Sequence, residues 1–375
     1  MKKSLIALAV FGAFSGAAFA DGSVQLYGLI DLGVTHYTGL AQGNAKGATA
    51  STPTVSSTGL SSGVQSGSRI GLKGTEDLGG GVSALFDVET GFCAAGLSQD
   101  QKVGVGGNPA GGYCTGGGFM QRQSYVGLTG NFGAVMAGRM YTNDFNNEAA
   151  MDPFGYGLNG NIGTLALGAP RADQTLVYIT PDLSGFTGNI AYVFAANKGT
   201  VPTAADPNVA RAVSVDGQYA NGPVVVGLSY TQVSNIIPNP TTAIPDGNNK
   251  LWQLFGSYNF GVAKVSGIYE KSTSDYSATN PDQKFFMLGA TVPVGPGAIL
   301  VSYNHRDNGM ADGVAKQYAI GYTYSLSKQT NLYASYAHLT NGNGTAYAVG
   351  SSTDSFTGVN GQSSSGMAIG IRHQF

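Results

Sequence analysis

Charged residues are scarce in this chain of 375 residues. Asp, Glu, Lys and Arg together make up 11% of the sequence, whereas about 25% is typical of a soluble domain. The net charge at pH 7 is −2, so the chain lacks the strongly basic surface of a nucleic-acid-binding protein. So little charge indicates that much of the folded surface contacts something other than water.

Long hydrophobic runs are also missing after the first twenty residues. Lys2 and Lys3 form a basic start, an apolar stretch follows, and an Ala-Phe-Ala cleavage site ends at Ala20. This pattern predicts a secretory signal peptide at residues 1–20 and a single mature domain at residues 21–375; a retained membrane anchor is the alternative. No later segment approaches the ~18 apolar residues of a membrane-spanning helix.

Cysteine is rare, with only Cys93 and Cys114 present, both in Gly-rich sequence. Export to an oxidising compartment favours a disulfide between them. In the chain-entropy model, such a bond would stabilise the loop of about twenty residues between the two cysteines by about 3 kcal/mol. Two free thiols are the alternative, and the absence of a C-x-x-C motif argues against a redox site.

Residues with the spacing of a catalytic or metal site are not found. None of the four histidines has a partner at metal-ligand or catalytic-triad spacing, and the Gly-rich VGVGGNPAGG (103–112) lacks the strand–helix setting of a phosphate-binding loop. We therefore predict no enzyme activity, no cofactor and no metal. The four histidines are His36, His305, His338 and His373.

Alternation of apolar and polar residues recurs along the whole chain. In the last segment, Met367, Ile369 and Ile371 share one parity, while Arg372 and Gln374 fall on the other. Successive side chains of a β-strand point to opposite faces, so each such run predicts a strand with one apolar and one polar side. Each run lasts about ten residues, the length of a tilted strand that crosses a bilayer. The chain is predicted to be all-β.

Short turns and long loops alternate between the predicted strands, as in an outer-membrane barrel. Long loops rich in Gly, Ser, Thr and Asn are predicted near 38–65, 93–118, 142–172, 196–210, 233–248, 307–314 and 339–364. An even number of strands closes an antiparallel barrel. The sixteen predicted strands are at roughly 23–37, 66–75, 81–92, 119–129, 132–141, 173–180, 186–195, 211–220, 223–232, 249–259, 262–271, 282–292, 297–306, 315–326, 328–338 and 365–375.

The polar side of the strands is predicted to face a water-filled lumen. Sixteen strands enclose more space than side chains can fill, and charges there stay hydrated. A soluble two-sheet sandwich also alternates, but its outer face would carry many more charges. A closed barrel pairs its last strand with its first, which puts Phe375 near a membrane interface. The residues assigned inward include Gln25, Asp31, Arg69, Lys73, Gln253, Lys264, Glu270, Asn304, Arg306 and Arg372.

Several stretches in order resemble the general porins of Gram-negative bacteria of the Burkholderia and Neisseria type: SVQLYGLIDLGV (23–34), SRIGLKGTEDLGGGVSALFDVETGF (68–92), RQSYVGLTGNFGAVMAGRMY (122–141), YITPDLSGF (178–186) and the terminal aromatic strand. The resemblance implies a 16-stranded barrel in outer-membrane lipid, a homotrimer, and passive diffusion of ions and small hydrophilic solutes. It also implies that the barrel assembly machinery reads Phe375. A substrate-specific channel of the same architecture is the alternative; an adhesin or outer-membrane enzyme is a more distant one.

The same resemblance implies that the third long loop, 141–173, folds inward and narrows the pore. The family places an acidic patch of this loop opposite an arginine cluster on the wall. Here Asp144, Glu148 and Asp152 are spaced by four, so a helix over 144–152 would carry all three on one side. The wall arginines assigned to the constriction are Arg69, Arg122, Arg139 and Arg171, with Lys73 and Asp31 facing the lumen nearby.

One position departs from the family pattern. Val177 stands where many members carry a basic residue in the sixth strand. Arg171 could replace that charge from the end of the loop, or the cluster is smaller, so the sign of the ion preference is not predicted. The alternative for all these residues is that the arginines are solvated strand ends and the carboxylates an ordinary exposed helix face.

Overall fold

The computed structural model describes residues 23–44, 48–95, 120–194, 211–236, 247–275 and 281–375. The predicted signal peptide lies outside the described residues, as does Cys114. Cys93 follows the fourth strand, and the proposed disulfide stays a prediction. Within the described part of the chain, no helix has the length and apolar character needed to cross a membrane.

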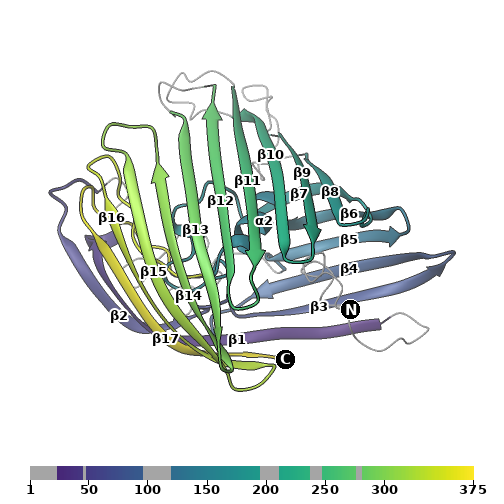
Figure 1. Cartoon of the computed structure of the whole chain (residues 1–375), viewed down its shortest axis with the longest axis horizontal. Helices are drawn as coiled ribbons and strands as arrows, with labels where there is room; N and C mark the ends of the chain where they lie inside the picture. Colours follow the sequence, from purple (N-terminus) through teal and green to yellow (C-terminus); the bar gives the residue numbers. More distant parts are fainter. Residues whose placement is uncertain (1–22, 45–47, 96–119, 195–210, 237–246, 276–280) are drawn as a thin grey trace.

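Seventeen strands form one antiparallel sheet that curls into a ring (Figure 1). Their bounds are β1 Ser23–Ala41, β2 Thr54–Ser62, β3 Arg69–Gly79, β4 Val82–Gly91, β5 Gln123–Gly130, β6 Gly133–Tyr141, β7 Arg171–Ile179, β8 Phe186–Val193, β9 Arg211–Asn221, β10 Val224–Ile236, β11 Gly247–Asn259, β12 Lys264–Ser274, β13 Gln283–Val294, β14 Gly297–Asp307, β15 Val314–Ser325, β16 Thr330–Asn341 and β17 Ser364–Gln374.

The ring is closed by pairing of the last strand with the first. β17 runs antiparallel to β1 from Leu29↔Gln374 to Thr38↔Ser365. On its other side β1 pairs with β2 along its later half and with β3 along its earlier half. Because β2 and β3 together occupy one place in the wall, the seventeen strands make a closed barrel of sixteen positions. The predicted fold class and strand number are confirmed.

One part of the segmentation was wrong. Residues 38–65 were predicted to be a loop, but β1 continues to Ala41 and residues 54–62 form β2. The sequence of β2, TVSSTGLSS, has few apolar residues and resembles loop sequence. Hydrogen bonding to the long first strand, and not burial of an apolar face, makes it a strand. The backbone groups of β2 that face β1 are paired in this ladder, which holds the polar strand in place.

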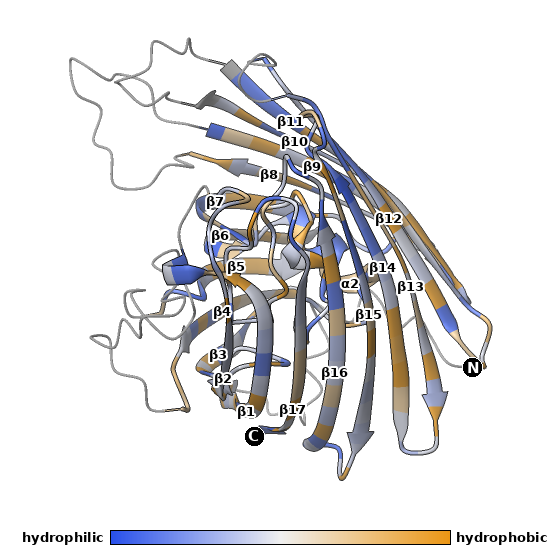
Figure 2. Cartoon of the chain, turned by 90° about the vertical axis from the view of Figure 1, so that its left-hand side faces the viewer, coloured by the Kyte–Doolittle hydropathy of each residue, from blue (hydrophilic) through white to orange (hydrophobic). Residues whose placement is uncertain are grey.

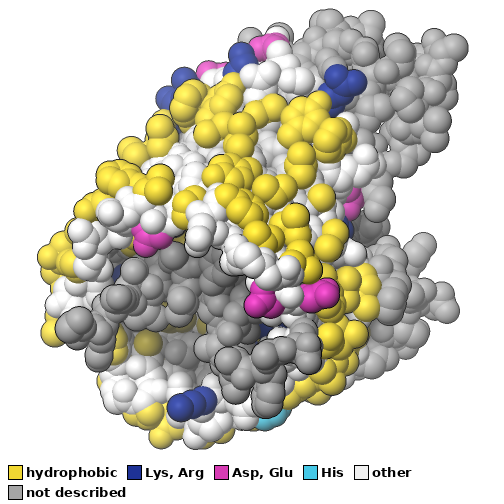
Figure 3. Space-filling view, turned by 90° about the vertical axis from the view of Figure 1, so that its right-hand side faces the viewer, with side chains coloured by type: hydrophobic (Ala, Val, Ile, Leu, Met, Phe, Trp, Pro, Cys, Tyr) yellow, Lys and Arg dark blue, Asp and Glu magenta, His cyan; other side chains and the backbone are white. Residues whose placement is uncertain are grey.

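Hydrophobic and hydrophilic residues are interspersed along the strands (Figure 2), and their exposure shows that the wall is apolar outside and mostly polar inside. On β11, Trp252 and Leu254 are 46% and 55% exposed, whereas Gln253 between them is fully buried. Figure 3 shows hydrophobic side chains spread over one outer face, with the charged side chains mainly toward its margins. An apolar outer band with aromatic residues is the surface that a transmembrane barrel presents to lipid. The predicted inside-out arrangement is therefore what the chain adopts.

Part of the interior is a dry core rather than open lumen. The chain between β6 and β7 turns inward, carrying helix α2 (Asn143–Met151) and a short helix η2 (Ile162–Thr164). Apolar residues of this loop pack on apolar residues that face inward from the opposite wall. The resulting cluster includes Met151, Ile162 and Leu165 of the loop with Val225, Phe255, Ile268, Phe285 and Met287 of β10 to β13. The open space is consequently displaced toward β3–β8.

Asp31 of β1 stabilises the region where β1 pairs with β17. Its carboxylate accepts a hydrogen bond from Tyr333 of β16 at 2.6 Å, and the backbone N–H groups of Gln65 and Ser66 donate to it as well. Tyr333 reaches Asp31 by crossing the sheet over Gly33 and Gly370. A Cβ atom at either glycine would collide with the Tyr333 hydroxyl, so both positions need glycine. Asp31 faces inward as expected, but it is fully buried and does not contact the lumen.

Candidate constriction site

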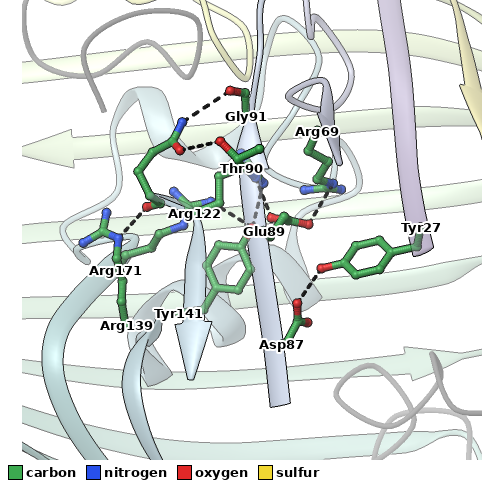
Figure 4. Close-up of polar contacts among 11 residues, drawn as sticks. Tyr27, Arg69, Asp87, Glu89, Thr90, Gly91, Arg122, Arg139, Tyr141 and Arg171 are labelled. Atoms are coloured by element: carbon green, nitrogen blue, oxygen red, sulfur yellow. Dashed lines mark hydrogen bonds and ion pairs between the residues drawn. The ribbon is translucent and has the colours of Figure 1, made fainter. Parts of the chain in front are cut away.

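Two arginines from different parts of the wall converge on one carboxylate of its inner face (Figure 4). Arg69 begins β3, and Arg122 immediately precedes β5. Both point at Glu89 of β4, with Nε–O distances of 3.4 Å from Arg69 and 2.6 Å from Arg122. One carboxylate cannot neutralise two guanidinium groups, so this part of the wall keeps positive charge. The Arg122 side chain is 3% exposed, whereas that of Arg69 is 24% exposed.

The phenol of Tyr141, at the end of β6, links the cluster to the inward loop. Its hydroxyl accepts hydrogen bonds from Nη2 of Arg122 at 2.9 Å and from Nη2 of Arg171 at 2.8 Å. The Arg171 guanidinium also lies 4.4 Å from the centre of the Tyr141 ring. On the loop, Phe145 of α2 stacks on the same ring at a centroid distance of 4.5 Å. Hydrogen bonds and ring contacts therefore fix the positions of both arginines.

Arg139 makes different contacts from those of Arg69, Arg122 and Arg171. Its guanidinium pairs with Asp173 at 2.8 Å, and its Nε donates to the backbone carbonyl of Gln121. It is not among the residues that border the lumen cavity, whereas Arg69, Arg122 and Arg171 are. The pairing of β6 with β7 shifts between Gly138 and Met140, which interrupts strict alternation at Arg139. The side of the wall on which Arg139 lies therefore cannot be predicted from the alternation of residues along β6.

Lys73 of β3 lies on the inner wall, closer to the turn that joins β3 to β4. Its ammonium group is 5.0 Å from the centre of the Tyr27 ring, and Tyr27 donates a hydrogen bond to Asp87 at 2.7 Å. All three residues border the cavity. The inner wall around Lys73 and Asp87 thus carries both signs of charge. The wall around Arg69 and Arg122 carries an excess of positive charge.

The carboxylates of the loop do not form the expected exposed acidic patch. Helix α2 is present within one residue of the predicted bounds, and Thr142 caps it by accepting from Phe145 N–H. However, Asp144, Glu148 and Asp152 are all at most 6% exposed. The face of the helix that carries Asp144 and Glu148 is turned toward the wall of β9–β12, away from the arginines.

Each buried carboxylate has a structural task instead. Asp144 accepts from the hydroxyl of Thr231 at 2.8 Å, and Glu148 accepts from Gly168 N–H at 2.8 Å while facing Glu270. Asp152 accepts from three backbone N–H groups of the loop, those of Phe154, Tyr156 and Ile162.

Burial also changes how these loop carboxyls titrate. Desolvation raises the pKa of Asp144 to about 7 and that of Asp152 to about 6, since the charged form loses its hydration. Burial next to Glu270 also raises the pKa of Glu148.

Helical periodicity could not have predicted which face of α2 is buried. A spacing of four puts Asp144 and Glu148 on one side, but Asn147 and Met151 share that side. The methionine joins the dry core, and Asn147 donates to Asp216 and Gln253 of the wall. Burial of this face follows from those contacts. The opposite face, with Phe145, is the one that borders the lumen.

A cavity of about 1440 Å³ runs past this cluster. Glu89, Tyr141, Phe145 and Tyr156 all contribute to the site, yet sequence reasoning did not select them. The inward parity of Glu89 with Asp87 was a usable signal for that residue. The sequence gives no such signal for Tyr141, Phe145 and Tyr156, because Tyr and Phe are abundant throughout the chain. Within the described ranges, no group of three or more His, Cys, Asp or Glu residues could hold a metal ion.

Comparison with known proteins identifies the family. A family described as Gram-negative porin matches residues 6–345. The chain belongs to the Gram-negative porin family. It is 33% identical to an outer membrane porin protein of Bordetella pertussis and 33% identical to outer membrane porin protein 32 of Delftia acidovorans, in each case over the whole of both chains.

Solved structures agree with this assignment. The anion-selective porin from Comamonas acidovorans superposes with a TM-score of 0.75 at 31% identity, covering 95% of this chain and 100% of that one. The protein is thus an outer-membrane porin of a Gram-negative bacterium, a channel for passive diffusion and not an enzyme. This outcome confirms the predicted function and location.

Proposed function

We propose that this porin is a diffusion pore for small hydrophilic solutes that prefers anions, with Arg69 and Arg171 as the accessible charges of its constriction. One observation carries the proposal: the acidic residues of the inward loop are buried, Asp144 and Glu148 against the far wall and Asp152 within the loop, whereas the arginines border the cavity. The field in this part of the pore is therefore set by guanidinium groups, of which Arg69 and Arg122 share Glu89 and Arg171 contacts Tyr141. Selection by rings of charged side chains follows from such an arrangement.

The comparison with known porins supports the same sign of selectivity. The Comamonas acidovorans structure that resembles this chain at 31% identity is described as an anion-selective porin. The substitution of Val177 for a basic residue does not remove the positive charge, because Arg171 borders the cavity from the end of the loop. A substrate-specific channel of the same architecture remains the second candidate.

The test is the zero-current potential of the purified protein in a planar bilayer that separates two KCl concentrations. Wild type is expected to show the polarity of chloride preference. Replacing Arg69 and Arg171 by Gln should move the potential toward zero by more than half of its wild-type value. The matched control is Arg139→Gln, which removes the same charge outside the cavity and should leave the potential nearly unchanged. Potassium preference in wild type would contradict the proposal.

We further propose that three copies assemble side by side in the membrane and that Phe375 is the signal for insertion. The support for assembly is an apolar groove on the outer face of β1 and β15–β17, lined by residues such as Leu32, Val34 and Ile369. Phe375 is 46% exposed and lies next to Gly28 of β1. A native mass of three chains, and loss of insertion on deleting Phe375, are the expected results; a single-chain mass contradicts the assembly.

A further inference from the structure

The inner wall next to the arginines is apolar, which the passage of mineral ions does not require. Met136, Met140 and Val177 form a buried cluster with Leu85 and Ala191 on β4 and β6–β8. The first three of these border the cavity. Val177 pairs with Met136 across the ladder, so the position that lacks the family's basic residue lies within this surface. We call Met136, Met140 and Val177 the apolar wall patch.

The same cavity is bordered by a row of aromatic rings that begins at an arginine and runs from the end of β6 into the inward loop. The Arg171 guanidinium lies over Tyr141, Tyr141 stacks on Phe145 with an interplanar angle of 10°, and Phe145 contacts Tyr156 at a centroid distance of 4.6 Å. All four side chains are half-buried and border the cavity. A guanidinium group and flat apolar surfaces thus adjoin each other at the constriction.

We propose that this constriction is a subsite for organic anions with a flat apolar body, of which aromatic monocarboxylates are the simplest, and that it passes them in preference to non-aromatic carboxylates of equal size. The inference rests on the proposed function, because it assumes a pore that admits anions. The carboxylate would be held by Arg69 or Arg171, whose donors fit carboxylate geometry. The ring would lie between Phe145 and the apolar wall patch.

The chemistry of the surfaces favours this ligand class over others. Aromatic rings prefer offset or edge contacts with other rings, and methionine sulfur also attracts aromatic rings. A mineral anion gains nothing from Phe145 or Met140. A neutral sugar could stack on the rings, but it would displace water from the guanidinium groups of Arg69 and Arg171 without neutralising their charge. Only an anion with an aromatic body uses both surfaces at once.

The experiment compares benzoate with cyclohexanecarboxylate, which have the same charge and nearly the same size but differ in flatness and aromaticity. Reversal potentials are measured under bi-ionic conditions against chloride, with potassium as the common cation. In wild type, benzoate is expected to be about two- to tenfold more permeant than cyclohexanecarboxylate, the range that one aromatic contact provides. The variant Phe145→Leu should bring this ratio close to 1.

A matched control is Phe356→Leu. Phe356 borders the same cavity, but its ring contacts Tyr37 and not the arginine row. This variant should keep the wild-type ratio. If both variants lower the ratio equally, or if wild type does not favour benzoate, the inference is overturned. If Phe145→Leu destabilises the loop, Val177→Thr provides a second test. This substitution makes the apolar wall patch more polar at almost constant volume, so it should also lower the ratio.

The two proposals fail in distinguishable ways. A KCl gradient reports the sign of selectivity, and the pair of carboxylates reports recognition of the aromatic body. Chloride preference together with equal permeation of the two carboxylates would leave the anion-preferring pore intact and refute only the aromatic subsite. Potassium preference in KCl would refute the proposed function itself.

Discussion

At the residue scale, the decisive arrangement is the sharing of Glu89 by two arginines. Arg122 is almost fully buried, so its charge is used to hold Glu89 and Tyr141 in place. Arg69 contacts the same carboxylate at a longer distance and is more exposed. Glu89 therefore lowers the positive potential of the wall, and Arg122 acts as a positioning residue rather than as a direct contact for solutes.

Replacing Glu89 by Gln should consequently increase anion preference. The amide keeps the volume and can still accept a hydrogen bond from an arginine, but the two guanidinium groups lose their counter-charge. The zero-current potential in a KCl gradient should rise above that of wild type. Glu76→Gln, an exposed substitution at the turn end of β3, removes an equal charge away from the cluster and serves as the control. A potential that falls or stays constant in Glu89→Gln would show that Glu89 does not set the local field.

At the scale of elements, α2 is held by buried polar contacts as well as by apolar packing. Asp144 and Glu148 lie against the wall strands, with Gln253 donating toward both Glu148 and Glu270. Burial favours the protonated form of such carboxyls. Because the pKa of Asp144 is raised above its ordinary value of 3.8, its contribution to stability is fully present below pH 4 and is lost as the pH rises through about 7.

Docking of α2 should therefore weaken as the pH is raised from 6 to 8.5. Ionised Asp144 and Glu148 would face Glu270 across the same buried contact, and the loop would move more within the lumen. The measurement is the noise of the open-channel current, which should increase several-fold over this interval. Asp144→Asn keeps an oxygen that accepts from Thr231 but cannot ionise, so most of the increase should disappear. An equal rise in noise in this variant would assign the effect to other groups.

At the scale of the whole molecule, the barrel is an inside-out protein with an off-centre pore. Lipid contacts the apolar outer band, and the inward loop fills the side near β10–β13 with a dry core. The open cavity lies on the side of the barrel that carries the arginines. The barrel thus has two apolar environments, one outside and one inside, separated by a single layer of strands.

A pair of charged substitutions should distinguish the two faces of the wall. Leu254 of β11 is 55% exposed on the outer face, between the aromatic residues Trp252 and Tyr258, whereas Thr129 of β5 borders the cavity on the inner face. Leu254→Arg should lower the free energy of unfolding in a bilayer by about 2–4 kcal/mol, the cost of a cation near the middle of the lipid. Thr129→Arg should cost much less, as followed by urea titration of folding into vesicles. Equal losses would contradict the assigned faces.

Local sequence was enough to predict the architecture. A strand that faces lipid must be apolar at every second residue, and this rule acts along each strand independently, as in the run around Trp252, Gln253 and Leu254. Inward parity likewise brought Arg69 and Lys73 to the inner wall. Local rules gave the wrong result for β2. This strand depends on pairing with β1, and such a partner cannot be recognised from the residues of β2 alone.

The composition of the constriction was decided by tertiary structure. Periodicity puts Asp144 and Glu148 on one face of α2, but two opposite orientations of a helix satisfy the same spacing. The loop takes the one in which Met151 joins the apolar cluster that includes Phe255, Ile268 and Phe285, where burial of apolar surface acts together with the hydrogen bonds of Asp144, Asn147 and Glu148. The alternating sequence thus determined that the chain is a barrel, whereas the docking of the loop, a contact between segments far apart in the sequence, decided which charges line its pore.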